Sequence, residues 1–219
     1  MNTTTLLIPL SRSTTLLTTW CALALGTVSA AESPGSSAFQ RNQPVIETAV
    51  EKALQYLAAN QSADGTFTDS YGRSVGVVSL VGMSFLSAGY TPGYGEFSDT
   101  IDRCITYVLD SQRSNGLLDK GDSGHGLMYA HNIAVLFLSE CSGMVNAETQ
   151  EKLSPILARA TKLILEAQAV PKNEGHAGGW RYKPDSRDSD LSCSGWALMA
   201  LRSAKLNGAP IPDDAINQA

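Results

Sequence analysis

The sequence predicts an all-α protein that is built from about three consecutive helical hairpins. From residue 44 onward, apolar residues recur with the period of an α-helix, and amphipathic stretches alternate with more apolar ones. A turn that begins with Gln and contains Gly follows each amphipathic stretch, at Gln61, Gln112 and Gln168. Because one hairpin cannot bury its own apolar face, we expect these units to stack on one another.

The first unit, residues 44–97, shows the plan of all three. Its amphipathic helix places apolar side chains on one face, at Ile46, Ala49, Ala53 and Leu57. A turn over residues 60–67 ends this helix, because Asp-Gly is a strong turn signal. A more apolar helix over residues 74–88 completes the hairpin, and we expect it to be the more buried of the two.

The second and third units, residues 98–146 and 147–212, repeat this plan. Helices are predicted at residues 98–109, 127–141 and 192–206. In the third unit, which starts near Ala147, Ser154-Pro155 either begins the amphipathic helix or kinks an existing one, and its stripe runs to Gln168. Asp213 and Asp214 follow a Pro and suit the first turn of a further helix, within residues 213–219.

The N-terminal region has the pattern of an export signal. Arg12 precedes an apolar stretch that is too short to span a bilayer, and small residues up to Ala30 offer a cleavage site. We therefore predict a signal peptide over residues 1–30, a polar linker over residues 31–43, and a periplasmic or extracellular location. The alternative is that the apolar stretch forms a buried first helix.

Composition excludes several classes of protein. The net charge is -5 and no Lys/Arg-rich run is present, which argues against a nucleic-acid partner. No stretch after the signal is apolar and long enough for a transmembrane helix. Removal of Cys21 with the signal would leave Cys104, Cys141 and Cys193, an odd number without the spacing of a disulfide framework. We expect Cys104 and Cys141 to pack in the core.

The three turns resemble the Gln…Gly-Trp motifs of the prenyltransferase and squalene-cyclase repeat superfamily. The turns are residues 60–67, 111–118 and 167–180, and the resemblance covers residues 44–219. It implies an α/α-toroid, in which helical hairpins form two concentric layers. This chain has fewer hairpins than a complete toroid, so the resemblance implies an incomplete ring that is truncated or is completed by a partner.

The resemblance also implies a catalytic acid. Cyclases of this superfamily that protonate their substrate use an Asp-x-Asp-Asp-Thr motif, which is similar to residues 188–192 here. By this match Asp190 would donate the proton, with Asp188 beside it. The residues themselves support an alternative, in which Asp188 or Asp190 caps the helix that follows. Trp196 and Tyr182 could line a substrate cavity, whereas Trp180 could line it or pack between hairpins.

We expect no metal and no cofactor. Protein prenyltransferases of the same superfamily bind zinc through an Asp-x-Cys pair and a later His. Asp190 fits that pair, but Ser192 stands where Cys is needed, Cys193 is one residue away, and no His follows. His125 and His176 lie in comparable loops and could meet, yet a zinc site needs three protein ligands.

Three functions are compatible with these residues. The resemblance favours an exported, terpenoid cyclase-like protein that acts on an apolar isoprenoid by proton-initiated cyclisation. The second possibility is a non-catalytic module that binds a protein, or another copy of itself, along the open edge of the repeats. The third is a carbohydrate-active enzyme, for which Asp185, Asp188 and Asp190 with Trp180 and Tyr182 are the candidates.

Overall fold

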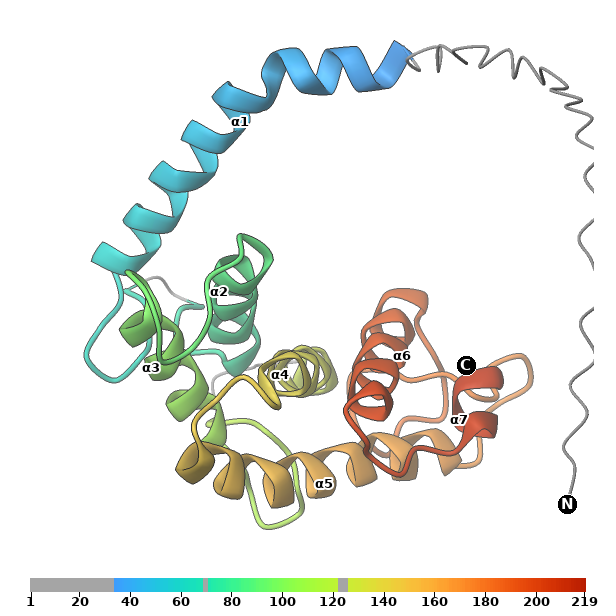
Figure 1. Ribbon diagram of the computed structural model, residues 1–219. Coiled ribbons are helices and arrows are strands. Elements are labelled where there is room, and N and C mark those ends of the chain that lie inside the picture. Colours follow the sequence, from blue (N-terminus) through green and yellow to red (C-terminus); the bar gives the residue numbers. More distant parts are fainter. Residues whose placement is uncertain (1–33, 69–70, 122–125) are drawn as a thin grey trace, which may run out of the picture. The chain divides into compact units, whose positions relative to one another are not determined.

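The computed structural model describes residues 34–68, 71–121 and 126–219, and this part of the chain is helical, without a β-strand (Figure 1). Its helices are α1 (Pro34–Ala59), α2 (Val75–Ser87), α3 (Ser98–Leu109), α4 (Leu127–Cys141), α5 (Ala147–Ala169), α6 (Leu191–Leu206) and α7 (Asp213–Asn217). The predicted all-α class is confirmed. None of these helices combines the length and the apolarity that a bilayer span requires. The signal predicted for residues 1–30 lies outside the described residues.

The chain divides into two compact units, Met1–Asn42 and Gln43–Ala219. The second unit begins beside residue 44, where the repeats were predicted to start. Within the segment predicted as a linker, residues 31–43, the chain is helical from Pro34, where α1 begins. Pro suits the first turn of a helix, since its missing N–H has no partner there in any case.

The more apolar helices form one layer of the second unit. In this layer α4 lies between α2 and α6 and packs against both, while α3 and α5 pack against its outer side (Figure 1). The largest buried aliphatic and aromatic side chains come from both layers: Phe85, Ile101, Phe137, Leu153, Ile164 and Leu201. Cys104 and Cys141 are buried among them as free thiols, as predicted. The core therefore lies between the two layers.

In each predicted turn, the side-chain amide of the turn glutamine forms a hydrogen bond to the helix that follows the hairpin. The Nε2 groups of the three turn glutamines donate to backbone carbonyls of α3, α5 and α7: Gln61 to Thr100 O (3.2 Å), Gln112 to Ile156 O (2.8 Å) and Gln168 to Ala215 O (2.8 Å). In the first two turns the Gln Oε1 accepts from an arginine Nε, of Arg103 (2.9 Å) and of Arg159 (2.7 Å). The same hydrogen bond therefore recurs at all three glutamines, which explains why they are regularly spaced along the sequence.

Each of these turns also contains a glycine whose backbone conformation and close contacts exclude a side chain. Gly65, Gly116 and Gly178 all have positive φ values, of 86°, 90° and 81°. A Cβ at these positions would meet the carbonyl oxygen of Arg103 at 2.5 Å, that of Arg159 at 2.7 Å, and that of Gln218 closer still. No other residue type fits, because left-handed backbone and close backbone approach coincide.

Replacement of Gln112 by Ala is expected to destabilise the fold by about 1–2 kcal/mol, because it leaves the Ile156 carbonyl and the Arg159 guanidinium without this partner. Urea unfolding followed by circular dichroism measures the loss. Gln55→Ala is the matched control, since the exposed Gln55 bonds through its amide only to Glu51 on its own helix. Equal midpoints for the two variants would show that the recurring contact adds no stability.

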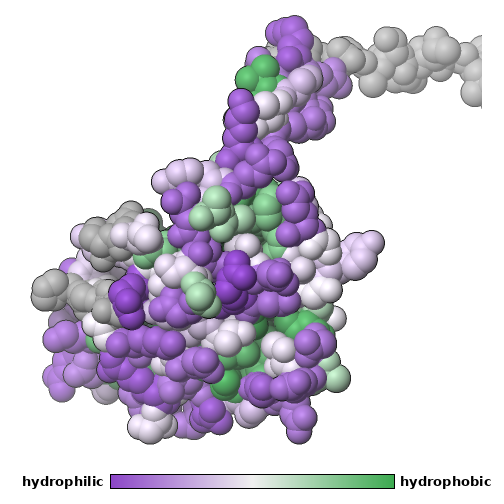
Figure 2. Space-filling model, turned by 90° about the vertical axis from the view of Figure 1, so that its left-hand side faces the viewer, coloured by the Kyte–Doolittle hydropathy of each residue, from purple (hydrophilic) through white to green (hydrophobic). Residues whose placement is uncertain are grey.

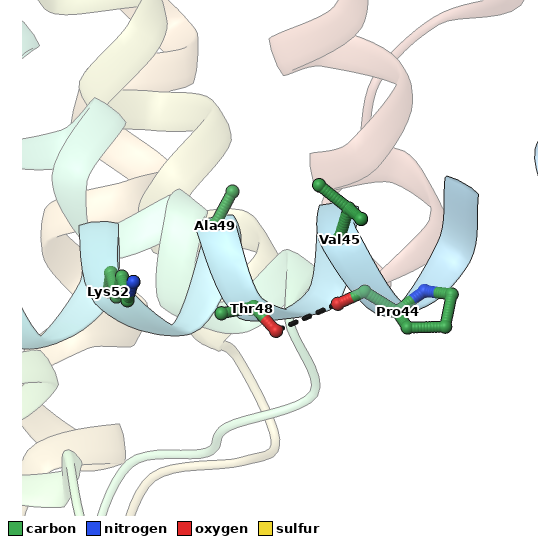
Figure 3. A pocket seen from close by; sticks show the side chains of 5 residues that line it. All are labelled: Pro44, Val45, Thr48, Ala49 and Lys52. Atoms are coloured by element: carbon green, nitrogen blue, oxygen red, sulfur yellow. Dashed lines mark hydrogen bonds between the residues drawn. The ribbon is translucent and has the colours of Figure 1, made fainter.

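The apolar stripe predicted for the first amphipathic helix remains largely uncovered. Of the predicted stripe, Ile46 is 43% exposed, Ala49 and Ala53 are exposed, and only Leu57 is half-buried against the core. The fully buried residue of the described part of α1 is Leu54, which was not part of the predicted stripe. Figure 3 shows Val45 and Ala49 on one side of α1, in a shallow hollow lined by α1 alone. Figure 2 shows a mostly hydrophilic face on which hydrophobic side chains emerge in separate groups. Amphipathic periodicity therefore predicted the helix but not its burial.

Candidate functional site at the start of α6

Asp190 is the N-cap of α6. Its backbone is extended, and its side-chain Oδ1 accepts a hydrogen bond from the Cys193 N–H at 2.9 Å. The same oxygen accepts from the hydroxyl groups of Ser192 (2.6 Å) and Tyr129 (2.9 Å). The prediction that this aspartate caps the helix is confirmed.

These donors determine the protonation state of Asp190. The hydrogen bond from Ser192, then those from the Cys193 N–H and from Tyr129, lower the pKa of the carboxyl group to about 2. A general acid must hold its proton at the working pH, which requires the opposite shift. In this arrangement Asp190 is an ionised cap, and the geometry does not favour the proton-donor role that the superfamily motif implies.

Tyr129 of α4 is the member of this site that sequence analysis missed. Its hydroxyl contacts both Asp190 and Ser192, and its ring packs against that of Tyr182, with centroids 5.8 Å apart. Tyr129 follows a Gly-rich loop and belongs to an apolar helix, where an aromatic residue suggests only core packing. No local pattern predicts that α4 places it beside a residue from the next hairpin.

Asp188 and Tyr182 lie at the exposed rim of the site. The Asp188 carboxylate pairs with the Arg181 guanidinium at 3.1 Å, and the two side chains are 43% and 34% exposed. Arg181 also lies over the Tyr182 ring, 4.7 Å from its centroid. An exposed ion pair of this kind adds little stability, although it holds the aromatic ring in place.

The two tryptophans differ in environment. Trp180 is 1% exposed, and its indole Nε1 donates to the Ile164 carbonyl of α5 at 2.7 Å. Trp180 is a packed core residue, and the contact shown is with α5 of its own hairpin rather than with a neighbouring hairpin. Its burial removes it from the candidates for lining a cavity. Trp196 is partly exposed on α6, in the second turn of the helix. The structure thus brings Asp190 and Tyr182 together through Tyr129, and leaves Trp180 in the core.

The zinc alternative finds no support in the described residues. Among them no group of three or more His, Cys, Asp and Glu side chains is placed as metal ligands would be. His176 uses its Nδ1 locally, as the acceptor from the Ser189 N–H at 3.0 Å. His125 lies outside the described residues. Cys193 is buried, which raises the pKa of its thiol to about 12 and disfavours the thiolate that zinc binds.

A fully buried histidine, His131, lies near the site but serves the fold. Its Nδ1 accepts from the Leu118 N–H at 3.0 Å, and its Nε2 lies 3.2 Å from the Ala160 carbonyl, to which it can donate. Burial lowers the pKa of the imidazole to about 4, so the ring is neutral near pH 7. His131 thereby links the second turn to α5.

The cluster at the start of α6 offers a fixed negative charge, two hydroxyl groups and an aromatic pair. Such a set can accept hydrogen bonds and attract a cation, and its carboxyl group is held in the ionised form rather than as a general acid. Five hollows on the described surface are lined by residues other than Asp190. Comparison with protein-family models, curated proteins and solved structures gave no match.

Proposed function

We propose that this chain is a non-catalytic module of α/α-toroid-type hairpin repeats, and that it works by binding a protein partner. The recurring contacts of Gln61, Gln112 and Gln168 support the repeat arrangement, as does the layer of α2, α4 and α6. In this arrangement α7 corresponds to the start of a further outer helix, since Gln168 bonds to it as the earlier glutamines bond to α3 and α5.

The observation on which the proposal depends is the environment of Asp190. A carboxylate that accepts from Ser192, Cys193 and Tyr129 is ionised, whereas a cyclase of this superfamily needs a protonated acid at that position. Every hydrogen bond just named stabilises the charged form. The strongest candidate for chemistry is therefore explained by the capping of α6.

Exposed apolar side chains at both ends of the array support a binding role. At one end α1 exposes Val45 and Ile46, and at the other α6 exposes Leu191, Met199 and Leu206, of which Leu191 is 91% exposed. Repeat arrays stack through such faces, and exposed apolar faces favour association.

Titration of Asp190 tests the proposal. We expect the carboxyl carbon of Asp190, assigned with Asp190→Asn, to titrate well below its ordinary value, and we expect no cyclised product when the full chain is incubated with squalene. Because the folded pKa lies below the unfolded one, Asp190 adds stability that is present above pH 4 and is lost as the pH falls toward 2. A raised pKa together with product formation would overturn the proposal.

Terpenoid cyclisation is the second candidate, favoured by one observation. The rings of Tyr129 and Tyr182 lie together beside Asp190, and aromatic faces can stabilise a carbocation. Carbohydrate hydrolysis is supported less, because Asp188 is engaged by Arg181 and Trp180 is buried. The squalene incubation distinguishes the cyclase from the binding module.

A further inference from the structure

A hollow lies between the last turns of α2 and α4, away from the Asp190 cluster. Its volume is about 440 Å³. Its lining residues are Met83, Leu86, Ser87, Leu136, Glu140 and Met144, and we call this hollow the α2–α4 groove. Because the residues come from the C-terminal part of both helices, two helix C-termini lie at the same groove.

The α2–α4 groove is apolar and has a firm floor. Four of its side chains are Met or Leu, and thioethers adapt well to the side chains of a bound helix. Beside the groove, Gly82 of α2 packs against the ring of Phe137 so closely that no Cβ could be accommodated. This contact joins the two helices, so a bound molecule would lie on a preformed surface.

The charge at the groove is negative. Glu140 is exposed and is the only Asp, Glu, Lys or Arg in either helix. One of its oxygens accepts from the Ser203 hydroxyl at 2.6 Å, and no ion pair among the described residues involves it. Neither helix has a basic residue in its last turn, so both C-terminal dipoles add to the negative potential.

We propose that the α2–α4 groove binds a basic amphipathic helix of a partner protein. Apolar residues on one face of that helix would fill the space beside Met83 and Leu136, and a Lys or Arg at its edge would meet Glu140 and the two helix C-termini. This inference rests on the proposed binding function and adds the place of binding and the chemistry of the partner.

Binding of a labelled Leu/Lys amphipathic peptide to the full chain, followed by fluorescence anisotropy, tests this inference. We expect saturable binding that weakens as salt is added. A Leu/Glu peptide of the same pattern and a Leu/Lys peptide with scrambled order should both bind worse, because the first lacks the cation and the second lacks an apolar face.

Two pairs of variants locate the site. Glu140→Gln should weaken binding about fivefold, whereas Glu174→Gln, the same charge change in an exposed loop, should leave it unchanged. Met144→Lys should weaken it about tenfold, because it places a like charge in the groove. Tyr94→Lys, in the loop between α2 and α3, is its control, since Tyr94 is exposed and does not line the groove.

Absence of binding would overturn the inference, as would equal effects of Glu140→Gln and Glu174→Gln, which would indicate attraction by net charge alone. Equal effects of Met144→Lys and Tyr94→Lys, or self-association that Met144→Lys abolishes, would overturn it too. None of these outcomes changes the protonation of Asp190 or the result with squalene. Failure of the groove and failure of the proposed function can therefore be told apart.

Discussion

Gly116→Ala is expected to destabilise the protein by about 2–5 kcal/mol. Gly116 has a φ of 90°, which costs an L-residue about 1–2 kcal/mol. The added Cβ would also lie 2.7 Å from the Arg159 carbonyl oxygen, and the displacement of backbone adds about 1–3 kcal/mol. The urea midpoint of unfolding measures the sum.

Gly89→Ala separates the two contributions. Gly89 has the same φ of 90°, but its added Cβ would have nothing within 4 Å. This variant should lose only the conformational part, about 1–2 kcal/mol. If both variants lost the same amount, the second turn could move away from α5 without cost, and the recurring turn contact would not hold the hairpins together.

The second large effect is a fall in the free energy of unfolding as the pH is lowered, which we expect His131 to cause. The pKa of His131 is about 4 in the folded chain and 6.5 is its ordinary value. Between these two pH values the imidazole is protonated in the unfolded chain but neutral in the folded one, so acid favours unfolding. Stability from this group is complete above pH 6.5 and is lost as the pH falls toward 4. Between pH 7.5 and pH 5 the expected loss is about 2 kcal/mol.

His131→Gln provides the comparison. Glutamine can accept from the Leu118 N–H and donate to the Ala160 carbonyl, as the neutral ring does, but it does not titrate. Unfolding free energies of both proteins at pH 7.5 and pH 5 give the test. The variant should lose less stability than the wild type over this range, and parallel curves would show that His131 does not cause the acid sensitivity.

Three of the helices, with their ends, followed from the sequence by itself. Helices predicted over residues 74–88, 127–141 and 192–206 are α2, α4 and α6, with boundaries that differ by at most one residue. The cap at Asp190 could be predicted because both partners of a cap lie within one turn of chain. Helical periodicity, Gly turns and caps are local properties, and neighbouring residues suffice to determine them.

Burial and protonation were decided only by the tertiary structure. The stripe on α1 predicts a packed helix, yet Ile46 is 43% exposed, because burial requires a neighbour that periodicity cannot supply. Tyr129 reaches Asp190 across hairpins, and that contact helps to keep the carboxylate ionised. His131 is neutral because α5 and the second turn enclose it. A pKa depends on desolvation and on donors brought from distant parts of the chain, which only the packed helices define.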